Sequence, residues 1–272
     1  MFYEYFNWGM MEKFQYVFLD SGIGGIPYLN YLLTRAKEAS VLYVADSKHF
    51  TYGEKTESEV IFLTLEIVKK ILETVSPEVI VLACNTMTVS ALKVLRNTFD
   101  IPFIGTVPAI KPANLVTKNN RIGLISTERT AKDIYTQRLI NEFLPNATVF
   151  VKAEAYLIDK IENGLAYENE EKQFEEIKPI ISFFEKENCD TLILGCTHFL
   201  HLRDSFIKMG KKCTPQISIV DSLEGVVNHI LELSPCKTNS RKIAITTTGK
   251  DKKKYRRYAK EYGFDFIEDI SI

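Results

Sequence analysis

Short apolar runs alternate with longer amphipathic segments along the chain, and this alternation limits the folds that the sequence can adopt. Segments with helical spacing, such as 57–75 and 170–188, separate most of the runs. Runs that are apolar throughout are typical of parallel strands covered by helices on both faces. We therefore predict an α/β fold with doubly wound, mostly parallel sheets. The predicted strands are 16–20, 41–46, 79–84, 101–105, 121–126, 147–151, 191–196, 217–221 and 242–248.

The alternating pattern also repeats weakly within the chain. Residues 17–33 resemble 123–140, and VIVLACNT (79–86) resembles TLILGCTH (191–198) at a similar offset. The repeat indicates two similar α/β halves, each with a cysteine at the end of its third strand. We predict two domains with the active site in the cleft between them. The first comprises residues 12–105 plus 217–272, the second comprises residues 106–216, and residues 1–11 form a disordered or extension segment.

The composition excludes several classes of protein. The chain has 272 residues, of which 46% are hydrophobic and 25% charged, so it can bury the core of a globular protein. A formal net charge of -1 gives no general attraction to nucleic acid or to a membrane surface. No run approaches the roughly eighteen apolar residues of a spanning helix, and the N-terminus lacks the pattern of a secretory signal. We expect no nucleic-acid partner and no membrane partner.

The five cysteines are too widely spaced for a disulfide framework or a structural zinc site. Their number is odd and no CxxC pair occurs, so we expect reduced thiols in a cytoplasmic protein. Cys189, Cys213 and Cys236 have no polar motif around them and are interpreted as structural.

Polar residues follow many of the predicted strands. In parallel α/β sheets, ligands bind beyond the carboxyl ends of the strands, so these residues predict a polar cleft. They are Asp20-Ser21-Gly22, Asp46-Ser47, Cys84-Asn85-Thr86, Ser126-Thr127, Cys196-Thr197-His198 and Asp221-Ser222.

The motif DSGIGG (20–25) lies between a predicted strand and a predicted helix. Its glycines allow the backbone to approach an anion, and the amides at a helix N-terminus favour negative charge. The spacing is neither that of a dinucleotide motif nor that of a P-loop, which leaves a tight structural turn as the other interpretation. We favour a cradle for a small carboxylate, with Asp20 available for proton transfer.

Two cysteines, Cys84 and Cys196, end equivalent strands and precede predicted helices. A single cysteine on an apolar strand is more often a core residue, but a helix N-terminus lowers the pKa of a thiol and exposes it. His198, two residues after Cys196, can orient or protonate that thiol. The pair is compatible with a redox disulfide, with a metal site that includes His198, or with two acid–base groups that flank a substrate carbon. The symmetric placement favours the last of these.

With these motifs in place, the sequence resembles the glutamate racemases, a family of the aspartate/glutamate racemase superfamily. The resemblance extends from about Phe14 to the C-terminus. Its motifs are LDSGIGG (19–25), ADSKHFTYG (45–53), ACNTMTVSAL (83–92), IPFIGTVPAIKPA (101–113), LISTERTAKDIY (124–135), LGCTHFLHL (194–202) and IVDSLEGV (219–226). The chain departs from the family's pattern at Thr51, where a proline is usual, at Phe199-Leu200, where an aromatic-Pro pair is usual, and in a less apolar stretch before IENG (161–164).

The resemblance implies racemisation of glutamate at Cα by two bases, without a cofactor or a metal. It assigns proton abstraction from D-glutamate to Cys84 and from L-glutamate to Cys196. It implies that Asp20 sets the protonation state of Cys84 and that His198 sets that of Cys196. Glu162 is implied as a third residue that assists in this way. The residues that it implies for binding the ammonium and carboxylate groups are Ser21, Tyr52, Gly53, Asn85, Thr86, Thr127 and Thr197.

The product, D-glutamate, would supply peptidoglycan synthesis in the cytoplasm. The expected partner is therefore a small molecule, and a homodimer is compatible with this interpretation. The alternatives are a racemase for another small amino acid, of the aspartate or hydantoin type, and a non-enzymatic amino-acid-binding protein of the same fold. The lysine-rich segment 250–257 could contact nucleic acid, but a solvated face of a C-terminal helix is the simpler interpretation.

Overall fold

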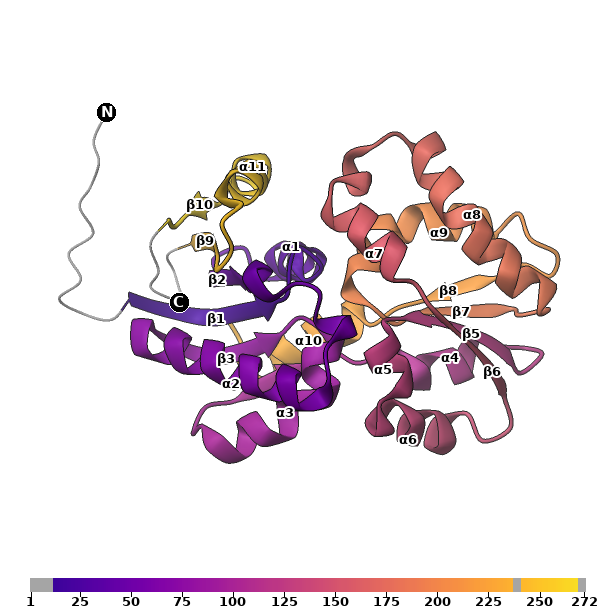
Figure 1. The fold of residues 1–272 in the computed structure, drawn as a ribbon, viewed down its shortest axis with the longest axis horizontal. Coiled ribbons are helices and arrows are strands. Elements are labelled where there is room, and N and C mark those ends of the chain that lie inside the picture. The colour runs from indigo at the N-terminus through magenta and orange to yellow at the C-terminus, as the bar shows by residue number, and fades with distance from the viewer. Residues whose placement is uncertain (1–11, 237–240, 269–272) are drawn as a thin grey trace.

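The computed structural model describes residues 12–236 and 241–268, and within them the chain forms two parallel sheets flanked by helices (Figure 1). The first sheet has the strand order β10-β9-β2-β1-β3-β4. Its strands are β1 (Glu12–Asp20), β2 (Ser40–Ala45), β3 (Val75–Leu82), β4 (Phe103–Gly105), β9 (Lys242–Thr247) and β10 (Asp265–Phe266). The segment 1–11, predicted to be disordered or an extension, lies outside the described residues.

The second sheet has the order β6-β5-β7-β8 and repeats the arrangement β2-β1-β3-β4 of the first sheet. Its strands are β5 (Arg121–Ser126), β6 (Thr148–Ala153), β7 (Thr191–Leu194) and β8 (Ser218–Val220). The predicted α/β class with two similar halves and parallel sheets is therefore confirmed. All nine predicted strands are present, whereas the two-residue β10 is too short to give a recognisable sequence pattern.

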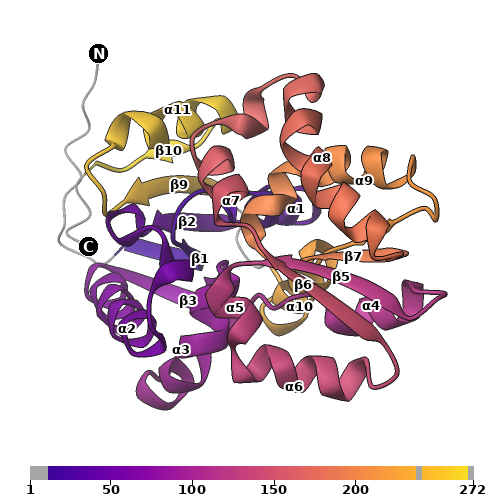
Figure 2. The same cartoon turned by 45° about the vertical axis from the view of Figure 1, so that its right-hand side comes forward.

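Helices cover both faces of each sheet (Figure 2). On the first sheet, α2 (Glu57–Thr74) and α3 (Asn85–Thr98) pack on one face. The other face carries α1 (Ile26–Arg35), α10 (Leu223–Leu233) and α11 (Lys252–Tyr262). On the second sheet, α4 (Ile110–Val116) and α6 (Ile134–Phe143) pack opposite α7 (Ala155–Glu162), α8 (Glu170–Lys186) and α9 (Arg203–Gly210). The short α5 (Glu128–Lys132) follows β5.

The apolar core is continuous between the two sheets. The cluster that contains Phe18 of β1 and Leu29 of α1 also contains Leu157 of α7 and Phe184 of α8. The two halves therefore share buried apolar surface, which stabilises their mutual arrangement.

The predicted return of the chain to the first domain at residue 217 comes one strand too early. Strand β8 pairs with β7, with Thr191 opposite Ser218, so residues 218–220 extend the second sheet. A short apolar strand does not specify its partner, and the sequence pattern therefore could not assign it. The chain returns to the first sheet with α10, which packs against α1 and β4. We keep the division into two domains as a proposal with this boundary moved beyond β8.

The strand register places the two cysteines at matching positions. Leu19 lies opposite Leu82 at the end of β3, and Ile125 lies opposite Leu194 at the end of β7. Cys84 and Cys196 each follow two residues after these strand ends, at the carboxyl edge where ligands bind in parallel sheets. Among the described residues, no helix is both long and apolar enough to cross a membrane.

Candidate active site

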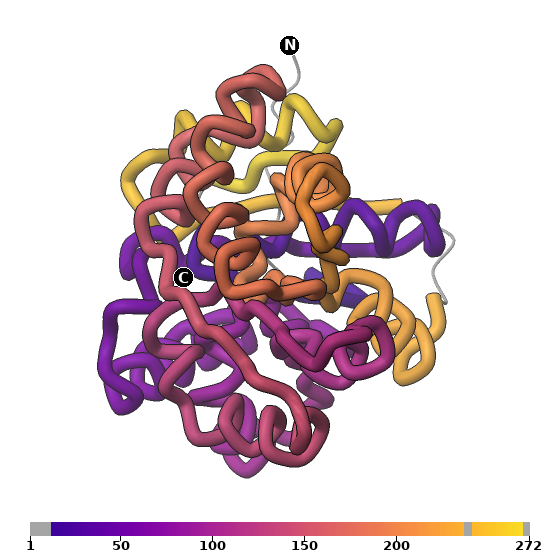
Figure 3. The backbone as a smooth tube through the Cα atoms, turned by 90° about the vertical axis from the view of Figure 1, so that its right-hand side faces the viewer, coloured from indigo at the N-terminus to yellow at the C-terminus, as the bar shows by residue number. Residues whose placement is uncertain are grey.

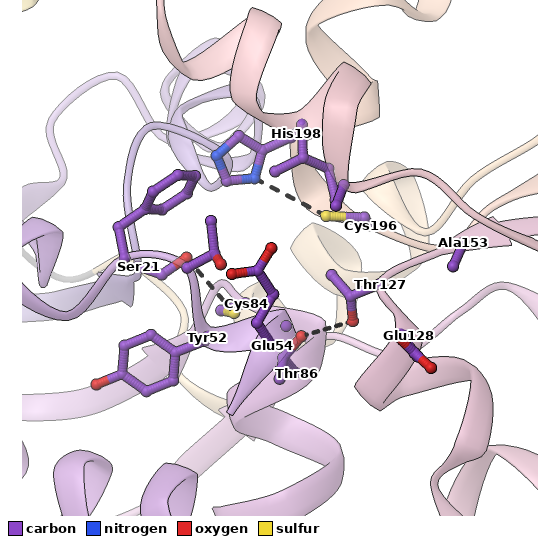
Figure 4. Close-up of a pocket in the computed structure, with 15 residues that line it drawn as sticks. Ser21, Tyr52, Glu54, Cys84, Thr86, Thr127, Glu128, Ala153, Cys196 and His198 are labelled. Carbon is purple, nitrogen blue, oxygen red and sulfur yellow. Dashed lines mark hydrogen bonds between the residues drawn. The ribbon is translucent and has the colours of Figure 1, made fainter. Parts of the chain in front are cut away.

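A cavity of about 280 Å³ lies between the two halves, and both cysteines line it (Figure 4). Its size suits a small metabolite rather than a macromolecular segment. No lysine or arginine is among the described residues that line it, so His198 is the one basic side chain at its surface. The lining residues are Ser21, Phe50, Thr51, Tyr52, Gly53, Glu54, Cys84, Thr86, Thr127, Glu128, Ala153, Ala155, Ile158, Cys196 and His198.

Cys84 immediately precedes helix α3 and is 6% exposed. Its Sγ lies 4.0 Å from the Ser21 hydroxyl oxygen. Burial, followed by the negative charge of Asp20, raises the pKa of the Cys84 thiol well above its usual value. In this arrangement Cys84 holds its proton, and it can give that proton up only to a base placed nearby.

Cys196 occupies the equivalent position before the 3₁₀ turn Thr197–Leu202 and is 7% exposed. Its Sγ lies 3.8 Å from Nδ1 of His198. Burial alone would lower the pKa of His198, but its hydrogen bonds to Cys196 and Glu162 outweigh burial and raise the pKa to about 10. The imidazole is therefore protonated at neutral pH and places a positive charge beside the Cys196 sulfur.

Glu162, the last residue of α7, is buried behind His198. Its Oε2 lies 2.9 Å from Nε2 of His198 and accepts the Ile23 backbone N–H at 2.9 Å. Its Oε1 accepts the Tyr255 hydroxyl at 3.2 Å and contacts the Lys254 ammonium. Burial opposes ionisation of this carboxyl, but His198 and Lys254 outweigh it and hold the pKa at about 2. Glu162 is thus a carboxylate that orients His198.

Asp20 is fully buried at the end of β1 and faces both halves. Its Oδ1 accepts the Gly22 N–H at 2.7 Å, and its Oδ2 accepts the Thr197 hydroxyl at 3.3 Å. Burial raises the pKa of Asp20 to about 6, although the charge of His198 and the hydrogen bond from Gly22 oppose the rise. The described contacts include no hydrogen bond from Asp20 to Cys84, so the pairing of these two residues stays a prediction.

The predicted substrate-binding residues fall into two groups. Five of them line the cavity: Ser21, Tyr52, Gly53, Thr86 and Thr127. The other two lie behind its wall and connect the halves: Asn85 donates to the Gly195 carbonyl at 2.7 Å, and Thr197 bonds Asp20. The Tyr52 hydroxyl points away from the cavity (Figure 4) and donates to Asp46 Oδ2 at 2.5 Å.

Three threonines join the halves at the wall of the cavity. The Thr86 hydroxyl of α3 lies 3.0 Å from that of Thr127, which precedes α5, and 3.3 Å from that of Thr130. Gly53 packs so closely here that a Cβ on it would lie 2.6 Å from the Thr127 Cβ. A side chain at position 53 would therefore push the two halves apart.

Sequence reasoning missed several residues of the site. Glu54 and Glu128 are adjacent in sequence to predicted residues, so the motifs that contain Tyr52-Gly53 and Thr127 could have indicated them. The apolar lining by Ala153, Ala155 and Ile158 has no recognisable sequence signal. Within the described part of the chain, no group of three or more His, Cys, Asp and Glu side chains is arranged to hold a metal ion.

Comparison with known proteins relates the chain to a single family. A family model described as Asp/Glu/Hydantoin racemase matches residues 33–230. The chain is 40% identical over 267 residues to a glutamate racemase from Treponema pallidum, a match that covers 96% of this chain and 98% of the relative.

Solved structures give the same relationship. A glutamate racemase from Escherichia coli, in complex with L-glutamate and the activator UDP-MurNAc-ala, has a TM-score of 0.80. It is 26% identical to this chain, and the match covers 95% of this chain and 98% of that one. A glutamate racemase isoform from Bacillus anthracis has a TM-score of 0.75 at 26% identity, with 97% of both chains covered.

Proposed function

The chain belongs to the Asp/Glu/Hydantoin racemase family, and we propose that it interconverts L- and D-glutamate by proton transfer between the substrate Cα and two thiols. One observation carries this proposal. Cys84 and Cys196 reach a single cavity from equivalent strand ends of two similar halves. Binding alone requires no such pair, whereas racemisation by two bases requires a base on one face of Cα and an acid on the other.

The proposed reaction balances without any further reactant. A thiolate takes the Cα proton, and the electron pair of the broken C–H bond remains on Cα, delocalised into the α-carboxylate. The opposite thiol then gives its proton to the other face of Cα. The two cysteines exchange protonation states in each turnover, and groups beside them must restore the starting state.

The surroundings of the thiols support distinct roles. The protonated imidazole of His198 lies 3.8 Å from the Cys196 sulfur, and in our proposal Cys196 abstracts the proton from L-glutamate. Asp20, with its pKa of about 6, is a carboxylate at neutral pH and serves in our proposal as the proton acceptor for Cys84. Glu162 does not reach the cavity and acts through His198 as a positioning residue.

The substrate carboxylates and ammonium would be held mainly by neutral groups. The hydroxyls of Ser21, Thr86 and Thr127 and the backbone of Gly53 line the cavity, and Asn85 and Thr197 lie just behind it. Fixed donors in a site closed to water stabilise the developing negative charge better than water does. Tyr52 would contact the substrate through its ring and backbone, because its hydroxyl is bound to Asp46.

In the cell, we propose that the D-glutamate produced supplies peptidoglycan synthesis, as the membership of the family implies. A cytoplasmic site for this reaction agrees with four buried thiols, Cys84, Cys189, Cys196 and Cys213, that form no disulfide, because thiols remain reduced in that compartment.

The direct test is to incubate the purified protein with each enantiomer of glutamate and of aspartate in deuterated water, with no cofactor added. We expect racemisation of glutamate with deuterium incorporated at Cα. Faster turnover of aspartate would assign a different substrate. Binding without exchange at Cα would contradict the enzymatic proposal and favour a binding protein.

A further inference from the structure

The lysine-rich helix α11 does not present all of its lysines to solvent. Tyr255 and Tyr258 are buried against the rest of the protein, and the Lys254 side chain is only 22% exposed. Figures 2 and 3 show this yellow C-terminal segment beside the rose-coloured segment that contains α7. The interpretation of 250–257 as a solvated charged face fits the exposed Lys253, Arg256 and Arg257 but not Lys254.

Lys254 joins the first sheet's C-terminal helix to the second half through Glu162. Its ammonium contacts Oε1 of Glu162, which also accepts the Tyr255 hydroxyl. The other oxygen, Oε2, binds the His198 ring. One oxygen of the buried Glu162 carboxylate thus binds residues of α11, and the other binds the imidazole that lies beside Cys196.

We propose that Lys254 is a positioning residue of the active site, which acts through Glu162 and His198 on the ionisation of Cys196. The inference rests on the proposed function insofar as it gives Cys196 a role in proton transfer. The chain of contacts Lys254–Glu162–His198–Cys196 alternates positive and negative groups once Cys196 is ionised.

The sign of the effect follows from charge. Without the lysine, the buried cluster carries one more net negative charge, which opposes formation of another anion at Cys196. The other ionisable groups that face His198 are Asp20 from the β1–α1 loop and His201 from its own 3₁₀ turn. Burial lowers the pKa of His201 to about 4, so this residue is neutral and cannot replace the missing positive charge.

The test uses Lys254→Gln, which keeps a hydrogen-bond donor toward Glu162 and removes the charge. Lys254→Arg restores the charge, and Lys260→Gln makes the same charge change at an exposed position of the same helix. In each protein, the rate of alkylation by iodoacetamide is measured against pH at Cys196 and at Cys84, by mass spectrometry of the peptides. This readout reports thiolate formation and does not require racemisation.

We expect Lys254→Gln to move the Cys196 alkylation profile to higher pH by roughly 0.5–1 unit. Lys254→Arg and Lys260→Gln should follow the original protein. A Cys196 profile unchanged in a folded Lys254→Gln protein would overturn the inference, as would an equal shift in Lys260→Gln. If Lys254→Gln does not fold, Lys254→Met, which removes the charge and keeps the length of the side chain, is measured in its place, and an unchanged Cys196 profile there would also overturn the inference.

The outcome is separable from that of the proposed function. A shifted profile in a protein that racemises no amino acid would support the role of Lys254 and contradict the function. Racemisation of glutamate with an unshifted profile would do the reverse.

Discussion

Cys84 and Cys196 occupy the same place in two similar halves, yet their surroundings differ in charge. Each follows its strand by two residues, precedes a helical turn and is almost completely buried. Cys84 lies beside the Ser21 hydroxyl and within the field of the Asp20 carboxyl. Cys196 lies beside a protonated imidazole that is held by a buried carboxylate.

The difference shows which property comes from the backbone and which from the side chains. The repeated strand order places two thiols at one cavity, but an identical pair would have identical protonation states. A two-base reaction needs one thiol and one thiolate at the start. The unequal neighbours supply that inequality, since burial and the charge of Asp20 hold the Cys84 thiol protonated, whereas a protonated imidazole lies beside Cys196.

The proposed roles of the two thiols would be contradicted most clearly if either thiol were not needed for racemisation. Replacing Cys84 or Cys196 by Ser should each reduce kcat/KM for glutamate by roughly 10³-fold or more, because an alcohol is far less acidic than a thiol. The double variant should lose little more than either single one, since the pair acts as a unit. Cys213 lies outside the cavity, so Cys213→Ser is the matched control and should keep its activity. Circular dichroism checks that each variant is folded.

A glutamate analogue with a leaving group at Cβ tests which thiol acts on which enantiomer. Elimination of the leaving group requires only the first proton abstraction, so a single thiol is sufficient. Cys84→Ser should retain elimination from the L-enantiomer, and Cys196→Ser from the D-enantiomer. If both variants kept the same enantiomer, the assignment of one thiol to each face would be wrong.

His198 and Asp20 should each affect only one of the thiols, Cys196 and Cys84 respectively. We expect His198→Asn and Asp20→Asn each to lower kcat by roughly 10²-fold, the usual contribution of one acid–base group. Alkylation of Cys196 near neutral pH should slow in His198→Asn and not in Asp20→Asn. Equal slowing in both variants would show that the two environments are coupled rather than distinct.

The pH dependence of kcat/KM tests the role of the Asp20 carboxyl separately from that of His198. Asp20 has a pKa of about 6 and must be ionised to accept the proton of Cys84, so kcat/KM for D-glutamate, from which Cys84 abstracts, should fall as the pH drops through about 6. One pH unit below that value, the loss should be about tenfold. Asp20→Asn should abolish this acidic limb while lowering the plateau, and a limb that persists in the variant would assign it to another group.

The smallest effect is expected where the halves meet through hydroxyls. Thr130→Val removes a group that bonds both Thr86 and Thr127 and should weaken glutamate binding by about fivefold, the equivalent of one hydrogen bond of about 1 kcal/mol. Thr98→Val, on the exposed end of α3, should leave KM unchanged. An unchanged KM in Thr130→Val would show that this contact between the halves does not shape the binding site.

The sequence predicts the strands and the cysteine positions because both depend on local apolar runs and on the residues that follow them. It does not assign β8 to a sheet, since a strand of three residues has no sequence pattern that identifies its partner, which is β7 in the structure. The direction of the Tyr52 hydroxyl and the contact of Lys254 with Glu162 also escape it. Tyr52 and Asp46 are only six residues apart, but the direction of the hydroxyl depends on the turns between them, which have no periodic pattern. Lys254 and Glu162 come from distant segments, and the sequence of an amphipathic lysine-rich helix does not indicate which lysine faces inward.

The pairing of β9 with β2 constrains the order in which a newly made chain can assemble. Ser40 lies opposite Lys242, so one edge of β2 remains open until β9 has been synthesised. The second sheet, in contrast, is encoded by the continuous stretch from β5 to β8 and needs no later residues. The first sheet is therefore completed after the second, and the α11 contacts to Glu162 form later still.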